Sequence, residues 1–152
     1  MTAAQQNGHM TVLVVDDEEG VRMLARRILE SAGYQVIEAV NGAEGVKMIE
    51  ANPQVDLLMA DLDMPVMRGE DMAVRIRAIR PTLRCLYVTA HIDALMDERP
   101  LLWDGEAFLE KPFSSASLVE AVRLLLTGRI GAPPPKHSST LKLLWSRIAG
   151  GR

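Results

Sequence analysis

The sequence has little cysteine, few aromatic residues and no long apolar run, and each shortage excludes a class of protein. Its 152 residues include a single cysteine, Cys85, which cannot form an intrachain disulfide and gives no sign of an oxidising compartment. No apolar run approaches the ~18 residues that span a bilayer. The first ten residues lack the basic start and apolar segment of a secretory signal peptide. We therefore expect a cytoplasmic protein without a membrane partner.

A large excess of either charge is also missing. Seventeen Lys and Arg against twenty Asp and Glu leave a formal net charge of -3, which does not favour binding to nucleic acid. What the sequence does contain is 48% hydrophobic and 24% charged residues with only 4% aromatic residues. This composition is typical of a folded domain with an aliphatic core. A length of 152 residues predicts one domain with short tails.

Five short apolar runs, each bounded by polar or turn residues, predict β-strands. They are 11–15, 35–39, 55–60, 84–88 and 107–109. The helical patterns between them are 21–29 with a stop at Gly33, 43–51, 70–79, 93–103 and 115–127. Pro100 interrupts the fourth helical pattern, so we expect a short or distorted helix there. Strands that alternate with helices predict an α/β fold with a parallel sheet and right-handed crossovers.

The predicted domain covers residues 11–127, and residues 1–10 are a tail. Residues 128–139 contain three consecutive prolines, which favour an extended linker. Residues 140–152 carry apolar side chains at i, i+3, i+4 and i+7, a pattern that predicts a short amphipathic helix. These side chains are Leu141, Leu144, Trp145 and Ile148. The roughly 25 residues after the domain are too few for an independent core, so we expect no DNA-binding domain there.

Reactive side chains follow four of the five predicted strands: Asp16 and Asp17, Asp61, Thr89 and Lys111. Ligands bind beyond the carboxyl ends of the strands in an open α/β sheet, so these side chains are expected to converge. Converging carboxylates repel one another unless a cation neutralises them, and Mg²⁺ suits acids that lack a Cys or His partner. Lys111 and Thr89 can hold phosphate oxygens. The pattern predicts phosphoryl transfer with Asp61 as the nucleophile.

Four motifs resemble those of the receiver domain of two-component response regulators, and the resemblance extends over residues 11–127. They are Val14-Val15-Asp16-Asp17-Glu18, Asp61-Leu62-Asp63-Met64-Pro65, Val88-Thr89-Ala90 and Leu109-Glu110-Lys111-Pro112-Phe113. The resemblance implies a flavodoxin-like five-stranded parallel sheet in the order 2-1-3-4-5. It also implies a phosphoacceptor switch of a two-component or phosphorelay pathway. Its phosphodonor would be a histidine kinase or a histidine phosphotransfer protein, and its output a contact with a downstream protein.

The resemblance also assigns roles around a magnesium ion. Asp61 would be the phosphoacceptor. Asp17, Asp61 and the backbone carbonyl of Asp63 would bind Mg²⁺, and Asp16 would act through a bound water. Lys111 would contact the phosphoryl group as a catalytic group.

Further roles concern the response to phosphorylation. The resemblance implies that Thr89 contacts the phosphoryl group and moves toward it, while Phe108 reorients. Because phenylalanine lacks a hydroxyl, coupling through Phe108 would use packing alone. Asp63 and His91 occupy positions that tune the lifetime of the phosphate in the family.

Other interpretations stay open at this stage. A receiver-like interaction module that is never phosphorylated is one, and a phosphatase similar to haloacid dehalogenases that uses Asp61 and Asp63 is another. Apart from the chemistry of its own phosphorylation and dephosphorylation, we expect no enzyme. The weak pattern at 93–103 argues against a conventional dimer through that helix, although self-association stays possible. Residues 91–113 resemble receivers of hybrid histidine kinases, so the chain is either a stand-alone relay protein or part of a larger one.

Overall fold

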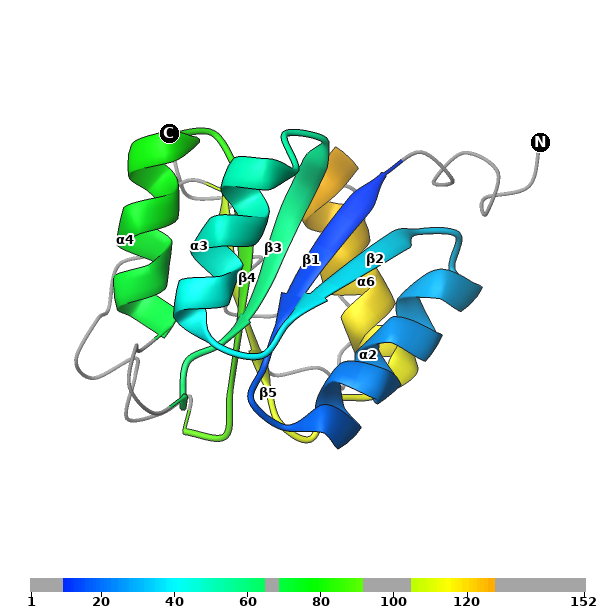
Figure 1. The fold of residues 1–152 in the computed structure, drawn as a ribbon. Coiled ribbons are helices and arrows are strands. Elements are labelled where there is room, and N and C mark those ends of the chain that lie inside the picture. Colours follow the sequence, from blue (N-terminus) through cyan, green and yellow to red (C-terminus); the bar gives the residue numbers. More distant parts are fainter. Residues whose placement is uncertain (1–9, 65–68, 92–104, 128–152) are drawn as a thin grey trace, which may run out of the picture.

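A single parallel sheet organises the molecule. The computed structural model describes residues 10–64, 69–91 and 105–127. Within them the sheet has five strands in the order β2-β1-β3-β4-β5, which is the predicted order (Figure 1). The strands are β1 (Thr11–Val15), β2 (Gln35–Ala39), β3 (Val55–Asp61), β4 (Arg84–Thr89) and β5 (Glu106–Glu110). The predicted α/β fold is therefore confirmed.

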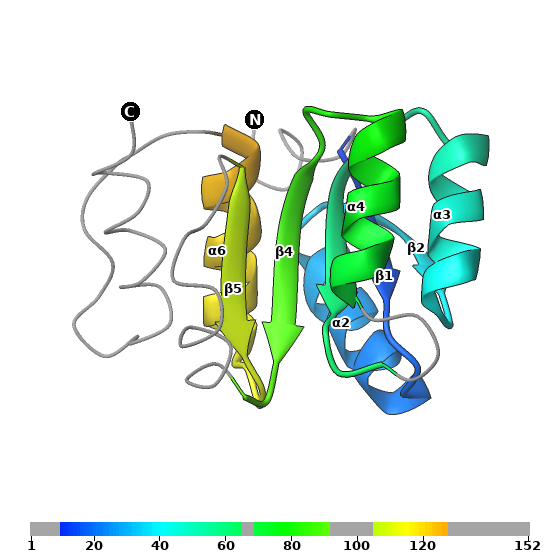
Figure 2. The same ribbon diagram turned by 90° about the vertical axis from the view of Figure 1, so that its left-hand side faces the viewer.

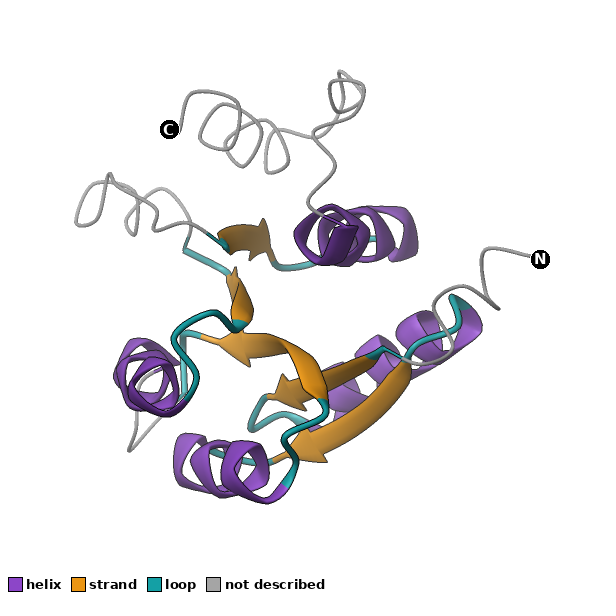
Figure 3. Ribbon diagram, turned by 90° about the horizontal axis from the view of Figure 1, so that it is seen from above, coloured by secondary structure: helices purple, strands orange, loops and turns teal. Residues whose placement is uncertain are grey.

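Two layers of helices cover the sheet. Helices α2 (Glu19–Ser31) and α6 (Ser115–Thr127) lie on one face, and α3 (Gly42–Ala51) and α4 (Gly69–Ile79) lie on the other (Figures 1 and 3). Each face has its own apolar cluster, with Leu29 and Leu118 in the first and Ile49 and Met72 in the second. The central strands are buried on both faces, as their continuously apolar sequence predicts.

Local sequence signals explain where the helices start and stop. Helix α2 ends at Ser31, and Gly33 follows it with φ 96°, a left-handed conformation that glycine adopts without strain. The predicted stop at Gly33 is therefore confirmed. Helix α3 begins after Asn41, whose side chain accepts a hydrogen bond of 2.8 Å from the backbone N–H of Glu44.

The predicted boundaries were wrong by a residue or two at several ends. Strands β3 and β4 each run one residue further, because Asp61 still pairs with Val88 and Thr89 with Glu110. Strand β5 begins at Glu106, one residue before its predicted start. Helices α2, α3 and α4 also begin earlier than their apolar patterns, since the first turn of a helix need not face the core.

Several predictions concern residues outside the described ranges. These are the distorted helix at 93–103, residues 1–9 of the N-terminal tail, the linker at 128–139 and the amphipathic segment at 140–152. In the part of the chain that the structure describes, no helix combines the length and apolar character needed to cross a membrane.

Candidate functional site

The predicted site residues meet at the edge of the sheet to which the strand arrowheads point (Figure 2). Asp16 follows β1, Asp61 ends β3 and Lys111 follows β5. The ammonium Nζ of Lys111 lies 3.0 Å from Asp16 Oδ2 and 3.3 Å from Asp61 Oδ2. Both aspartates are buried, each 3% exposed. Residues far apart in the sequence therefore form one ionic cluster, because β1 and β3 are neighbours at the centre of the sheet.

The two aspartates are oriented in the same way by their local backbone. Oδ1 of Asp16 accepts a hydrogen bond of 2.9 Å from the N–H of Glu18, and Oδ1 of Asp61 accepts one of 2.9 Å from the N–H of Asp63. Such turns, closed by a side chain onto the backbone two residues on, are a common property of aspartate. They leave Oδ2 of each carboxylate directed at Lys111.

A cluster of carboxylates adjoins this ion pair. Asp16, Asp17 and Glu18 each offer an oxygen, and these oxygens lie within 4.8 Å of one another. Asp16 is buried while Asp17 and Glu18 are exposed. Sequence reasoning did not assign Glu18 a role, although four consecutive acids after a strand, at 16–19, could have drawn attention to it. The donor set is made only of carboxylate oxygens, so it fits a hard divalent cation such as Mg²⁺.

Burial and neighbouring charges alter the pKa values of Asp61 and Lys111. The pKa of Asp61 is raised, mainly by burial and further by the charge of Asp16, although the Asp63 N–H and Lys111 act against the increase. Burial alone would lower the pKa of Lys111, but its hydrogen bonds and charge interactions with Asp16 and Asp61 raise it overall. Lys111 therefore stays protonated, and a divalent cation would relieve the repulsion between the acids.

The hydroxyl of Thr89 is engaged by the loop after β3. Thr89 Oγ1 lies 3.2 Å from Oδ2 and 3.3 Å from Oδ1 of Asp63, to which it donates. The same Asp63 Oδ2 accepts a hydrogen bond of 3.1 Å from the N–H of Ala90. Thr89 Oγ1 in turn accepts one of 3.0 Å from the N–H of His91, an exposed residue. The side chain of Asp63 therefore links the loops after β3 and β4.

Phe108 occupies a different environment, in the buried apolar cluster that also contains Met72 of α4. Its ring packs against Tyr87 with the centroids 5.3 Å apart. The Tyr87 hydroxyl donates a hydrogen bond of 2.5 Å to Glu106 Oε2, and Arg77 Nη2 lies 3.5 Å from that oxygen. Burial raises the pKa of Tyr87 strongly, so the hydroxyl keeps its proton. Sequence reasoning missed this buried polar group, because it treated Glu106 as the polar boundary of a strand.

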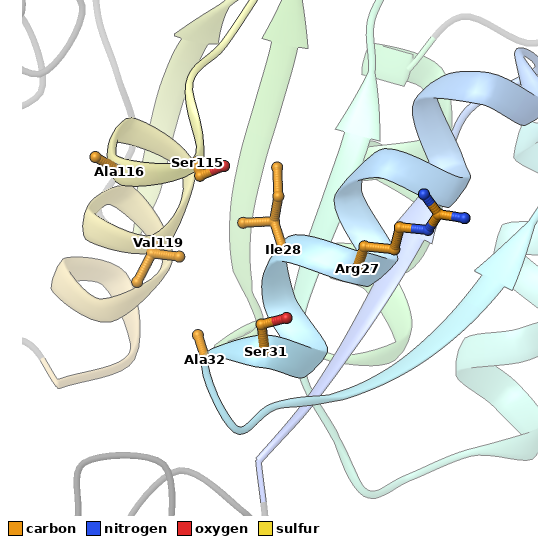
Figure 4. A pocket seen from close by; sticks show the side chains of 7 residues that line it. All are labelled: Arg27, Ile28, Ser31, Ala32, Ser115, Ala116 and Val119. Atoms are coloured by element: carbon orange, nitrogen blue, oxygen red, sulfur yellow. The ribbon is translucent and has the colours of Figure 1, made fainter.

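A groove lies elsewhere, between α2 and α6 (Figure 4). Its volume is about 510 Å³, and its lining consists of Arg27, Ile28, Ser31, Ala32, Ser115, Ala116 and Val119. This lining contains no carboxylate, in contrast to the edge of the sheet. The groove and the acid cluster are therefore separate features.

Known proteins match this chain over most of its length. The sequence pattern of the response regulator receiver domain matches residues 12–123. The chain is 35% identical over 126 residues to the sensor kinase CckA of Brucella abortus (strain 2308), covering 82% of this chain but only 13% of that protein. It is 35% identical over 113 residues to the chemotaxis protein CheY of Thermotoga maritima, covering 73% of this chain and 92% of that protein.

A solved structure extends this similarity to three dimensions. The response regulator TrrA of Thermotoga maritima, in complex with Mg²⁺-BeF, has a TM-score of 0.68 and 32% sequence identity, covering 77% of this chain and 99% of that one. The fold, the acidic edge and these matches agree, and the chain belongs to the response regulator receiver domain family, the signal-transduction domains of two-component systems.

Proposed function

We propose that this domain is a magnesium-dependent phosphoacceptor switch in which Asp61 receives the phosphoryl group. The donor would be a histidine kinase or a histidine phosphotransfer protein, and the output a protein contact in the cytoplasm. The proposal rests on the cluster in which one ammonium, that of Lys111, contacts both Asp16 and Asp61. A buried nucleophile beside a fixed positive charge is what phosphoryl transfer requires, since catalysis of this reaction is mainly positioning and charge neutralisation.

The acids at the sheet edge would hold the cation. Asp17, Asp61 and the backbone carbonyl of Asp63 would be the direct ligands, and Asp16 would act through a bound water. When bound, Mg²⁺ neutralises the charge on the phosphoryl oxygens. The carboxylate oxygens of Asp16 and Asp17, which lie close together, support a hard cation at this edge. The relative TrrA, which was solved with Mg²⁺-BeF, supports magnesium as that cation.

The transfer itself needs few protein groups. A carboxylate oxygen of Asp61 forms a bond to phosphorus while the bond from phosphorus to the donor's imidazole nitrogen breaks, and the imidazole leaves. Lys111 would pair with a phosphoryl oxygen. The Thr89 hydroxyl, which now donates to Asp63, would exchange that acceptor for the phosphoryl group.

That exchange would release Asp63 and alter the loop after β4. Asp63 and His91 both contact Thr89, which is consistent with an influence on phosphate lifetime. Phe108 would respond through its packing against Tyr87.

Phosphorylation by a small phosphodonor tests the proposal. Acetyl phosphate with Mg²⁺ is expected to add one phosphoryl group to the chain, detected by intact-protein mass spectrometry. Asp61→Asn should abolish the modification, and a chelator should prevent it. Asp71→Asn serves as the control, because Asp71 is an exposed acid on α4.

Each other outcome of this experiment would support a different site or function. Modification that persists in Asp61→Asn would move the site to another residue. An unmodified wild-type chain would favour the interaction module, and repeated turnover of phosphate esters would favour a phosphatase.

A further inference from the structure

Arg22 ties the acidic loop to the neighbouring strand. Its Nη1 donates a hydrogen bond of 2.7 Å to the backbone carbonyl oxygen of Asp16. Its Nε lies 3.4 Å from Oε1 of Glu38 on β2, and the Arg22 side chain is only 13% exposed. One guanidinium therefore spans the loop after β1 and the edge strand, a contact for which its planar fork of donors is suited.

Every polar group of Asp16 has a partner. Its N–H donates to the carbonyl of Ala39 at 3.3 Å. Its side-chain oxygens accept from the N–H of Glu18 at 2.9 Å and from Lys111 Nζ at 3.0 Å. The contact with Arg22 completes this set. Because the Asp16 carbonyl belongs to the peptide that joins Asp16 to Asp17, the Arg22 hydrogen bond also sets the direction in which Asp17 leaves the strand.

We infer that Arg22 is a positioning residue of the cation site, which it supports through the backbone of Asp16 without touching the cation. The inference rests on the proposed function, because it concerns the same magnesium site. Groups that orient metal ligands by hydrogen bonds, without binding the metal themselves, typically contribute 10- to 100-fold to metal affinity. Glu38 is the partner that holds the guanidinium in place.

A second effect of Arg22 has the opposite sign. Its positive charge, close to the acids, repels a cation, so its removal would by charge alone strengthen Mg²⁺ binding. If Arg22 positions the acidic loop, its removal should instead weaken Mg²⁺ binding. Lysine separates the two effects, because it keeps the charge but its single ammonium lacks the fork that reaches both the Asp16 carbonyl and Glu38.

The test is calorimetric titration of the full chain with Mg²⁺. We expect Arg22→Met and Arg22→Lys each to raise the dissociation constant by about tenfold. Arg26→Met is the matched control. Arg26 lies one turn further along α2 and also pairs with the Glu38 side chain, but the backbone carbonyl to which it donates is that of Val36, at 3.0 Å, and not that of Asp16. This control should change the constant by less than about twofold, since it leaves Asp16 untouched.

Urea unfolding separates positioning from general stability. Arg22→Met and Arg26→Met should lower the free energy of unfolding by similar amounts, while only the former weakens Mg²⁺ binding. Unchanged or stronger binding in both Arg22 variants would overturn the inference, as would equal weakening in Arg26→Met. If Arg22→Met does not fold, Arg22→Lys decides between these outcomes. A wild-type chain that binds no Mg²⁺ would overturn the proposed function along with the inference, whereas wild-type binding with unaffected variants would overturn only the role of Arg22.

Discussion

Two groups of buried charges in this domain differ in the ratio of negative to positive side chains and in access to solvent. At the edge of the sheet, Asp16 and Asp61 share one ammonium, and the exposed Asp17 and Glu18 add further negative charge. Beneath α4, Glu106 is paired with Arg77 and accepts from the hydroxyl of Tyr87. The first group has an excess of negative charge and opens to solvent through its exposed members. Among the described residues, the second group pairs one carboxylate with one guanidinium, and it is enclosed, since the Glu106 side chain is 0% exposed.

The difference separates a site that can bind a ligand from one that holds the fold together. An uncompensated cluster can gain free energy from an added cation, whereas a balanced pair loses free energy when either partner is removed. The raised pKa of Asp61 comes mainly from burial, and the charge of Asp16 contributes to it. The same chemical change, from a carboxylate to an amide, should therefore have opposite effects on stability in the two groups.

The largest effect is expected at Glu106. Glu106→Gln keeps an acceptor for Tyr87 but removes the buried carboxylate that pairs with Arg77, and removal of one partner of a buried ion pair costs about 3 kcal/mol. Urea unfolding would measure the loss. Glu110→Gln, at the half-buried end of the same strand, is the control and should cost far less. If Glu106→Gln lowers the free energy of unfolding no more than Glu110→Gln does, the charges around Glu106 do not hold the fold together, and the comparison with the sheet edge fails.

The next largest effect concerns the thiol of Cys85, which lies in the enclosed region. Burial raises its pKa to about 11 from an ordinary value of 9.0. Because the thiolate is the reactive form, the native protein at pH 8 should react with a disulfide reagent at least about 100-fold more slowly than the unfolded chain. The native rate should increase as the pH is raised toward the pKa. Rapid labelling of the native protein at pH 8 would show that this region is open.

The smallest effect is expected for Asp61→Asn in the presence of a chelator. The folded pKa of Asp61 lies above its unfolded value, so the stability present below the unfolded pKa is lost as the pH rises through the folded one. At neutral pH the carboxylate charge thus opposes folding, and its removal should stabilise the domain.

Magnesium should reduce the stability advantage of Asp61→Asn over the wild type. At ten times its dissociation constant, Mg²⁺ would stabilise the wild type by about 1.4 kcal/mol, and Asp61→Asn by less. Asp56→Asn is the control on the same strand. Asp56 accepts a hydrogen bond from the Thr11 N–H at 2.8 Å, so this substitution should destabilise the domain. A destabilised Asp61→Asn protein would contradict the charge imbalance at the sheet edge.

The strands and the convergence of Asp16, Asp61 and Lys111 were predictable because both follow from local patterns. Apolar runs of a few residues mark buried parallel strands, and the chain leaves each of them at the same edge. The contact between Thr89 and Asp63 was not predictable in this way, because it depends on the path of two loops. Neither was the burial of Glu106, because a charged residue at a strand boundary usually faces solvent.

The order of apolar and polar residues by itself determined the α/β architecture and the reactive residue types at the strand ends, since these depend on periodicity and on the direction of parallel strands. Only the tertiary structure decided which side chains share a partner. Arg22 reaches the Asp16 carbonyl and Glu38 at once because the sheet order places β2 beside β1, and Thr89 donates to Asp63 because β3 and β4 are neighbours. Such contacts depend on distances of a few ångströms between separate elements, and no local pattern in the sequence encodes them.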